Sequence, residues 1–143
     1  MTDSDALERF VDAQRGVIDQ VRDELRAGRK RSHWMWFVFP QVAGLGFSAM
    51  AARYAIASAD EARAYLRHPV LGPRLVECTG LVNGVEGRSL NAILGSPDDL
   101  KFRSSMTLFA EVATDQPIFE AALAKYCDGK PDQRTLELLR AAR

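Results

Sequence analysis

The residues of this sequence best suited to chemistry are polar side chains set inside apolar segments. Histidine exchanges a proton near neutral pH, which makes His33 the candidate catalytic residue. A cation such as Arg74 or Lys101 could neutralise an anionic group, and a tryptophan ring could stack on a ring of the same ligand. The ligand-binding candidates that share this setting are Ser32, His33, Trp34, Trp36, Gln41, His68, Arg74, Lys101, Ser104 and Ser105.

Each of these residues also has a structural interpretation. A buried polar group costs about 1–3 kcal/mol unless it is hydrogen-bonded, so it either finds a partner within the fold or lines a pocket. His33 could donate to a backbone carbonyl. Ser104 and Thr107 could bond the carbonyl one turn back in their helix. The tryptophans could belong to the core or form a stacking platform, and both interpretations stay open at this stage.

Standard motifs for cofactor and metal chemistry are missing from the sequence. There is no Gly-rich phosphate loop, no dinucleotide fingerprint and no His-Glu-x-x-His. His33 and His68 are 35 residues apart and lack a nearby cluster of cysteines or acids, which argues against a metal site. The acidic pair Asp98-Asp99 follows a Ser-Pro dipeptide and is better explained as a helix start than as an acid/base pair. We therefore predict no metal and no cofactor, and leave open whether the protein is an enzyme.

The longest region without charge runs from Ser32 to Ala52, in a chain that is 27% charged. It holds both tryptophans, so it must be buried or form a surface for a partner. Pro40, Gly44 and Gly46 interrupt it, which argues against a membrane span. Two functions follow as alternatives. The protein is either a small-molecule binding protein or enzyme for an anionic, ring-bearing ligand, or a non-enzymatic protein–protein interaction module that uses the aromatic segment.

The composition is that of one ordinary globular domain over residues 1–143, with 47% apolar residues. Lys plus Arg and Asp plus Glu number 19 each, and the zero net charge argues against a nucleic-acid partner. The basic cluster Arg26–Arg31 is typical of a helix C-terminus, with a phosphate-binding patch as the alternative. Cys78 and Cys127 lack metal-ligand spacing and are expected as reduced thiols. The N-terminus has no apolar signal core, so we expect a cytoplasmic protein, monomeric or weakly dimeric.

The elements that must position these residues are all helices. Apolar residues at helical spacing up to Leu25 predict one long helix that Gly28 ends. Ser58-Ala-Asp-Glu61 predicts a capping box, and the segment after Ser96-Pro97 predicts a strongly apolar helix at the centre of the fold. The aromatic segment is expected to form a short helix or irregular turn ended by Pro40.

These patterns predict an all-α, single compact multihelical domain of about seven helices. The predicted pocket lies where three segments converge: the Ser32–Gln41 segment, the His68–Arg74 corner and the Lys101–Thr107 helix.

Several long segments of the chain resemble a bacterial family known as domain of unknown function 1810. These segments are Lys30 to Gly46, Tyr54 to Ile56, Glu61 to Leu75 and Lys101 to Phe109, and the resemblance extends from Leu7 to Leu136. It implies a multihelical fold, and a mycobacterial member of known structure is very similar. The family brings no assigned reaction, substrate or catalytic residue. Some members carry a calpastatin label, which we discount because calpastatin inhibitors are disordered repeat proteins whereas this chain is compact and repeat-free.

Overall fold

Residues 3–142 of the chain are described by a computed structural model, with side chains from residue 6 onward. This part of the chain is all-α, as predicted, but it carries ten helices rather than about seven. They are α1 (Asp3–Gln14), α2 (Ile18–Arg26), α3 (Met35–Val38), α4 (Ala49–Arg53), α5 (Ala59–Arg67), α6 (Leu71–Asn83), α7 (Leu90–Leu94), α8 (Asp98–Val112), α9 (Ile118–Tyr126) and α10 (Gln133–Ala141). No helix within residues 3–142 has the length and apolarity that a bilayer crossing requires.

The difference in helix number comes from one break and from short elements. The single helix predicted up to Leu25 is two helices, because α1 ends at Gln14 and α2 starts at Ile18. Gly16 between them has a φ of 87°, which glycine adopts without the steric cost that other residues incur. α3 is the short helix expected before Pro40, and α4 and α7 have only five residues each.

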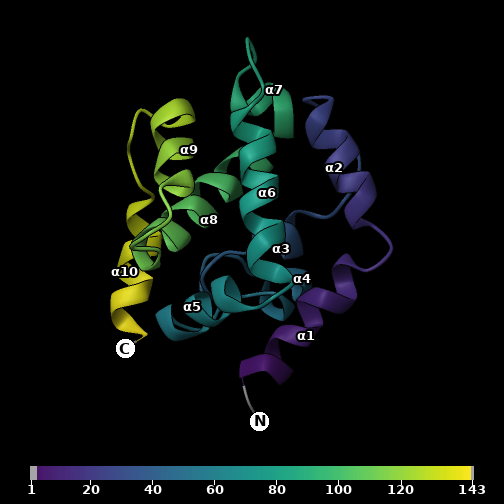
Figure 1. The fold of residues 1–143 in the computed structure, drawn as a ribbon. Helices are drawn as coiled ribbons and strands as arrows, with labels where there is room; N and C mark the ends of the chain where they lie inside the picture. Colours follow the sequence, from purple (N-terminus) through teal and green to yellow (C-terminus); the bar gives the residue numbers. More distant parts are fainter. Residues whose placement is uncertain (1–2, 143) are drawn as a thin grey trace.

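α8 is the central helix, as its apolar composition predicted. It packs against α5, α7, α9 and α10, and Figure 1 shows it crossing the interior beside the α9–α10 pair. Phe102, Met106 and Phe109 of α8 are fully buried. Phe39 from the uncharged segment packs edge-on against Phe102, with the ring centroids 5.0 Å apart. The uncharged segment is therefore anchored in the core by contact with α8.

The corner between α5 and α6 is fixed by a side-chain cap and a close backbone approach. His68 Nδ1 accepts hydrogen bonds from the backbone N–H groups of Val70 and Leu71, at 3.1 and 3.2 Å, and so caps the start of α6. A Cβ at position 72 would lie 2.1 Å from Leu66 O, so only glycine fits at Gly72. The His68–Arg74 corner is thus fixed by local contacts of the His68 side chain and of the backbone around Gly72.

Both cysteines are free thiols, as their spacing predicted. Cys78 is 1% exposed, and burial raises the pKa of its thiol to about 12. Cys127 is half-buried, and burial raises its thiol pKa as well. Neither environment favours the reactive thiolate form.

Candidate functional site

A buried carboxylate, that of Glu24 in α2, holds the start of the uncharged segment. Its Oε1 accepts hydrogen bonds from Arg31 N at 2.7 Å, from Ser32 N at 3.1 Å and from Trp34 Nε1 at 3.0 Å. Its Oε2 accepts from Ser32 Oγ at 2.6 Å and from Gln20 Nε2 at 3.0 Å. The carboxylate therefore fixes the path of the chain from α2 into α3. We call these five residues the Glu24 anchor.

The Glu24 carboxylate at the centre of the anchor has all its acceptor positions filled. Burial by itself would raise the pKa of Glu24, which is only 7% exposed. The hydrogen bonds from Ser32, Arg31 and Trp34 together outweigh burial and lower that pKa to about 2. A carboxylate that already accepts five hydrogen bonds has no capacity left for a ligand. Ser32 and Trp34, two of the predicted ligand-binding residues, are therefore committed to the fold.

Asp98, in the first turn of α8, links two tryptophan–lysine pairs. Its Oδ2 pairs with Lys30 Nζ at 2.9 Å, and its Oδ1 lies 3.8 Å from Lys101 Nζ. The Lys30 ammonium lies over the Trp34 ring, 5.0 Å from a ring centroid, and the Lys101 ammonium lies over the Trp36 ring at 5.1 Å. Trp34 is 2% exposed, whereas Trp36 is only partly buried. The inner pair is closed, and the outer pair reaches the surface.

The outer pair lines a cleft of about 390 Å³. Phe47 and Leu100 stand at its rim, 97% and 61% exposed. Four of the predicted ligand-binding residues meet in it: Trp36, Gln41, Lys101 and Ser104. An apolar hollow with a few convergent polar groups is the usual form of a ligand site. We call this hollow the Trp36 cleft.

Asp132, the N-cap residue of α10, brings a carboxylate to the Trp36 cleft. Its Oδ2 accepts hydrogen bonds from Ser104 Oγ at 2.9 Å, from Thr135 N at 3.3 Å and from Thr135 Oγ1. Lys101 and Ser104 are one helical turn apart on α8, so the ammonium of Lys101 and the carboxylate bound to Ser104 belong to neighbouring positions. The cleft therefore carries one cation and one anion.

Three hydroxyl groups of α8 were candidates for structural hydrogen bonds. Thr107 Oγ1 donates to Arg103 O at 2.8 Å, and the single Ser104 hydroxyl hydrogen is shared between Leu100 O at 3.2 Å and the closer Asp132 Oδ2, so both contacts predicted to the preceding turn are present. Ser105 is fully buried in the core, and its Oγ has no hydrogen-bond partner among the described residues. It does not line the Trp36 cleft.

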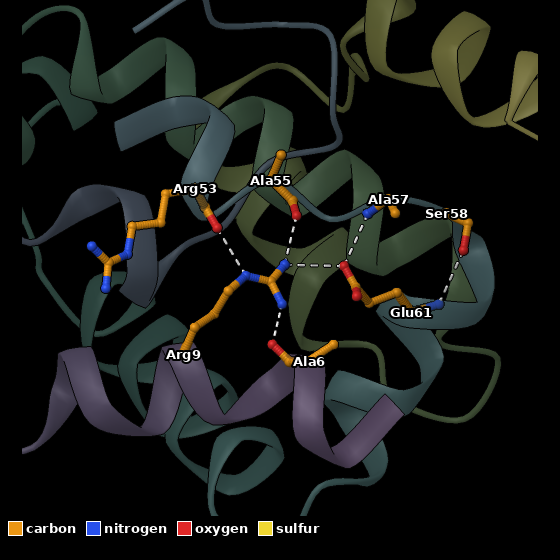
Figure 2. Close-up of polar contacts among 7 residues, drawn as sticks. All are labelled: Ala6, Arg9, Arg53, Ala55, Ala57, Ser58 and Glu61. Carbon is orange, nitrogen blue, oxygen red and sulfur yellow. Dashed lines mark hydrogen bonds and ion pairs between the residues drawn. The ribbon is translucent and has the colours of Figure 1, made fainter. Parts of the chain in front are cut away.

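A second hollow of about 240 Å³ adjoins the Trp36 cleft and shares Trp36 and Gln41 with it. Ala55 forms part of its wall, in the segment that follows α4. The guanidinium of Arg9 holds this segment, because its Nε donates to Arg53 O and its Nη2 donates to Ala55 O, both at 2.8 Å (Figure 2). A side chain of α1 thus fixes the wall of the hollow.

The same guanidinium also contacts α1 itself and α5 (Figure 2). Arg9 donates to Ala6 O and pairs with Glu61 Oε1 at 3.3 Å. Glu61 N donates to Ser58 Oγ at 3.3 Å, which confirms the predicted hydroxyl cap of α5. The Glu61 carboxylate accepts from Ala57 N at 3.0 Å, one residue before the cap. We call this arrangement the Arg9 clamp.

Besides Ser32, Trp34 and Ser105, three further predicted residues lie away from the Trp36 cleft. His33 is exposed, and its side chain makes no hydrogen bond within the described part of the chain, so the expected bond to a backbone carbonyl is not formed. His68 caps α6, and Arg74 donates to Gln14 Oε1 at 3.2 Å. The aromatic segment and α8 therefore meet as expected, whereas the His68–Arg74 corner does not join them and α10 supplies the third side.

Two buried polar residues that organise this region were missed by the sequence analysis. Gln14 is 1% exposed, and its Nε2 donates to Phe37 O at 2.7 Å, which ties α1 to α3. Glu24 forms the anchor described above. Gln14 follows Phe10 by four residues and Glu24 follows Val21 by three, so both occupy positions of the apolar stripe. A polar residue at a stripe position was the pattern that could have revealed them.

The basic cluster after α2 is divided by the fold. Lys30 turns inward to Asp98 and its side chain is 8% exposed, while Arg26, Arg29 and Arg31 remain exposed. Nowhere in residues 6–142 are three His, Cys, Asp or Glu side chains grouped as metal ligands would be.

The fold is that of a small all-α protein built around one sealed and one open tryptophan. The family model described as Protein of unknown function (DUF1810) matches residues 4–139, and the chain belongs to this family. The chain is similar to the conserved hypothetical protein Rv1873 from Mycobacterium tuberculosis, whose crystal structure matches with a TM-score of 0.92 and 61% sequence identity over 94% of this chain and 96% of that chain. No curated protein matches the chain. The family resemblance is confirmed, and it assigns no activity.

Proposed function

We propose that this protein binds a small molecule carrying a ring and an anionic group, and that the binding site is the Trp36 cleft. The observation that carries the proposal is the partly buried Trp36 ring with the Lys101 ammonium 5.1 Å from its centroid, both lining a hollow of about 390 Å³. The indole offers a stacking surface, and the ammonium offers a compact positive charge. Lys101 is held loosely, since Asp98 is 3.8 Å away, and its flexible stem can turn the ammonium to a ligand.

The arrangement supports binding better than catalysis. Ser104 already donates to Asp132 at 2.9 Å, and no imidazole lines the cleft to take a proton from it. His33, the proton-transfer candidate, is exposed and outside the cleft. The groups that line the Trp36 cleft can orient and neutralise a ligand, and the proposal therefore stops at binding.

A thermal-stability screen tests this proposal. Metabolites that contain a ring and a carboxylate or phosphate are added to the wild type, to Trp36→Leu and to Lys101→Met. A ligand present at a hundred times its dissociation constant stabilises the folded state by about 2.7 kcal/mol, which gives a clear rise in Tm. We expect at least one compound to raise the Tm of the wild type and to raise that of either variant much less.

Lys130→Met is the matched control for this screen, because Lys130 is exposed and does not line the Trp36 cleft. The control should respond to ligand as the wild type does. The proposal is wrong if no such compound stabilises the wild type, or if both cleft variants retain the full response.

The alternative function is a protein–protein interaction module, and one observation favours it. Trp34 and Phe39 are buried, but Phe47 is 97% exposed beside the exposed Leu100. An aromatic side chain in this position suits a contact with another protein or with a second copy of the chain. Solution molecular mass, measured over a range of concentrations for the wild type and Phe47→Ser, distinguishes the two: a dimer that Phe47→Ser abolishes supports this alternative.

A further inference from the structure

We infer that the ligand of the Trp36 cleft is a zwitterion, an aromatic α-amino acid or a molecule with the same pair of charged groups. This inference rests on the proposed function and adds an ammonium group to the ring and the anionic group already assigned to the ligand. It follows from the second charge in the cleft, the carboxylate of Asp132, which comes from α10 rather than α8.

The Asp132 carboxylate has unused bonding capacity. All three of its hydrogen bonds, from Ser104 Oγ, Thr135 N and Thr135 Oγ1, reach the same oxygen, Oδ2. Its Oδ1 accepts no hydrogen bond from residues 6–142. A carboxylate can accept about four hydrogen bonds over its two oxygens, so one whole oxygen is available to a donor from a ligand.

The Lys101 ammonium is also incompletely paired. Its contact with Asp98 Oδ1 is 3.8 Å long, beyond hydrogen-bond distance, because Asp98 makes its close pair with Lys30 at 2.9 Å. The ring of Trp36 is its other contact. An ammonium group has three donors, and these can be directed at an anionic group without breaking a bond of the fold.

These two groups select for a ligand with both charges. Lys101 and Ser104 are one turn apart on α8, and Asp132 is bonded to Ser104, so the two charges flank one region of the cleft. A ligand with only an anionic group would bring its charge close to the Asp132 carboxylate, and like charges in a partly desolvated site repel. A ligand with a carboxylate and an ammonium on adjacent positions satisfies both side chains. Its ring can then lie against Trp36, in the cleft that Leu100 also lines.

Calorimetric titration with probes that share one ring tests the inference. L-phenylalanine carries both charges, 3-phenylpropionate lacks the ammonium group, and phenethylamine lacks the carboxylate. L-tryptophan, indole-3-propionate and tryptamine form the same series with a larger ring. We expect the amino acid of at least one series to bind at least tenfold more tightly than both partial analogues.

The variant Asp132→Asn sharpens this experiment. Asparagine caps a helix as well as aspartate does, so α10 keeps its N-cap while the cleft loses the negative charge. Asp132→Asn should weaken binding of the amino acid at least tenfold and leave the affinity for the ammonium-free analogue unchanged or higher. Asp128→Asn is the control, because Asp128 is exposed, lies outside the cleft, and has a positive φ of 54° that asparagine also adopts.

The outcomes separate this inference from the proposed function. If an ammonium-free analogue binds as tightly as its amino acid and Asp132→Asn changes neither affinity, the inference of a zwitterionic ligand is wrong. The proposed binding of an anionic ring compound then stands. If neither amino acid binds at millimolar concentration, the inference is also wrong, and the metabolite screen decides the proposed function on its own. A far-UV circular dichroism spectrum of Asp132→Asn equal to that of the wild type verifies that α10 is retained.

Discussion

Trp34 and Trp36 are two residues apart and each has a lysine ammonium over its ring, at 5.0 and 5.1 Å, yet their surroundings differ completely. Trp34 donates its Nε1–H to Glu24, and Lys30 pairs with Asp98 at 2.9 Å, so the indole N–H and the ammonium of the inner pair are both bound. Around the outer ring the lysine is 3.8 Å from the same carboxylate, and the ring lines a cleft. The same residue types thus build a structural contact in one place and a candidate binding site in the other.

The difference shows how a buried polar group can be assigned to stability or to binding. A group whose donors and acceptors are all used within the fold stabilises it and has nothing to offer a ligand. A group with spare capacity beside a hollow can bind one. The predictions below test whether the inner pair is as saturated, and the outer pair as loosely held, as the distances indicate.

The largest effect is expected from Glu24→Ala, which removes the carboxylate that accepts the indole N–H of the inner pair. The substitution leaves the Trp34 indole N–H and the backbone N–H groups of Arg31 and Ser32 without their acceptor. We expect the free energy of unfolding to fall by about 4 kcal/mol, measured by urea denaturation. Glu77→Ala is the control: Glu77 is exposed and pairs with Arg22, so its loss should cost less than about 1 kcal/mol. Equal costs would contradict a saturated anchor.

Acid should also lower the free energy of unfolding, because it protonates the Glu24 carboxylate. The pKa of Glu24 is lowered from 4.5 to about 2 in the folded protein, so its stabilising contribution is complete above pH 5 and is lost as the pH falls from 5 towards 2. The shift corresponds to about 3 kcal/mol. Glu24→Gln cannot titrate, and the difference in unfolding free energy between it and the wild type should shrink over that range. A difference that stays constant from pH 6 to pH 3 would rule out the lowered pKa.

One substitution made at both lysines compares the two pairs directly. Lys30→Met leaves the largely buried Asp98 without its close partner and should cost about 2 kcal/mol of unfolding free energy. Lys101→Met removes only a long contact and should cost less than about 0.5 kcal/mol. Urea denaturation of the two variants under one condition measures the difference. Similar costs would mean that the outer lysine is as firmly held as the inner one.

The last prediction concerns the wall of the hollow that adjoins the Trp36 cleft. Arg9→Lys replaces a planar fork by a single ammonium, which cannot reach both Arg53 O and Ala55 O, and should cost about 1 kcal/mol. Amide hydrogen exchange should become faster in residues 53–57, the segment that the Arg9 clamp holds. Arg15→Lys, in an exposed pair with Asp12, is the control and should change neither quantity. Unchanged exchange in Arg9→Lys would show that the wall is held by other contacts.

Local patterns in the sequence predicted the parts of the fold that depend on near neighbours. The Ser58 cap, the hydrogen bonds of Ser104 and Thr107 to the preceding turn, and the central position of α8 each follow from a few consecutive residues. The break at Gly16 was not predicted, because the apolar stripe continues across it with the same spacing.

The candidate site was predicted only in part, because its geometry depends on segments far apart in the sequence. Trp34 and Trp36 are the same residue type in the same apolar segment, so the sequence does not show which one is buried. The difference depends on Glu24, ten residues before Trp34, whose carboxylate accepts the Trp34 indole N–H. Asp132 was missed because it reaches the cleft from α10, 28 residues after Ser104. His33 stands beside the buried Trp34, yet its own side chain points to water.

Because Cys78 is buried, its reaction with a thiol reagent reports when the fold opens. Its thiol is 1% exposed and its pKa is raised to about 12, so a thiol reagent can modify it only in molecules that have unfolded locally or globally. The rate of modification therefore measures how often the protein unfolds locally or globally, without any attached dye. Cys127, the C-cap residue of α9, is half-buried and should react faster, as a second reporter within the same molecule.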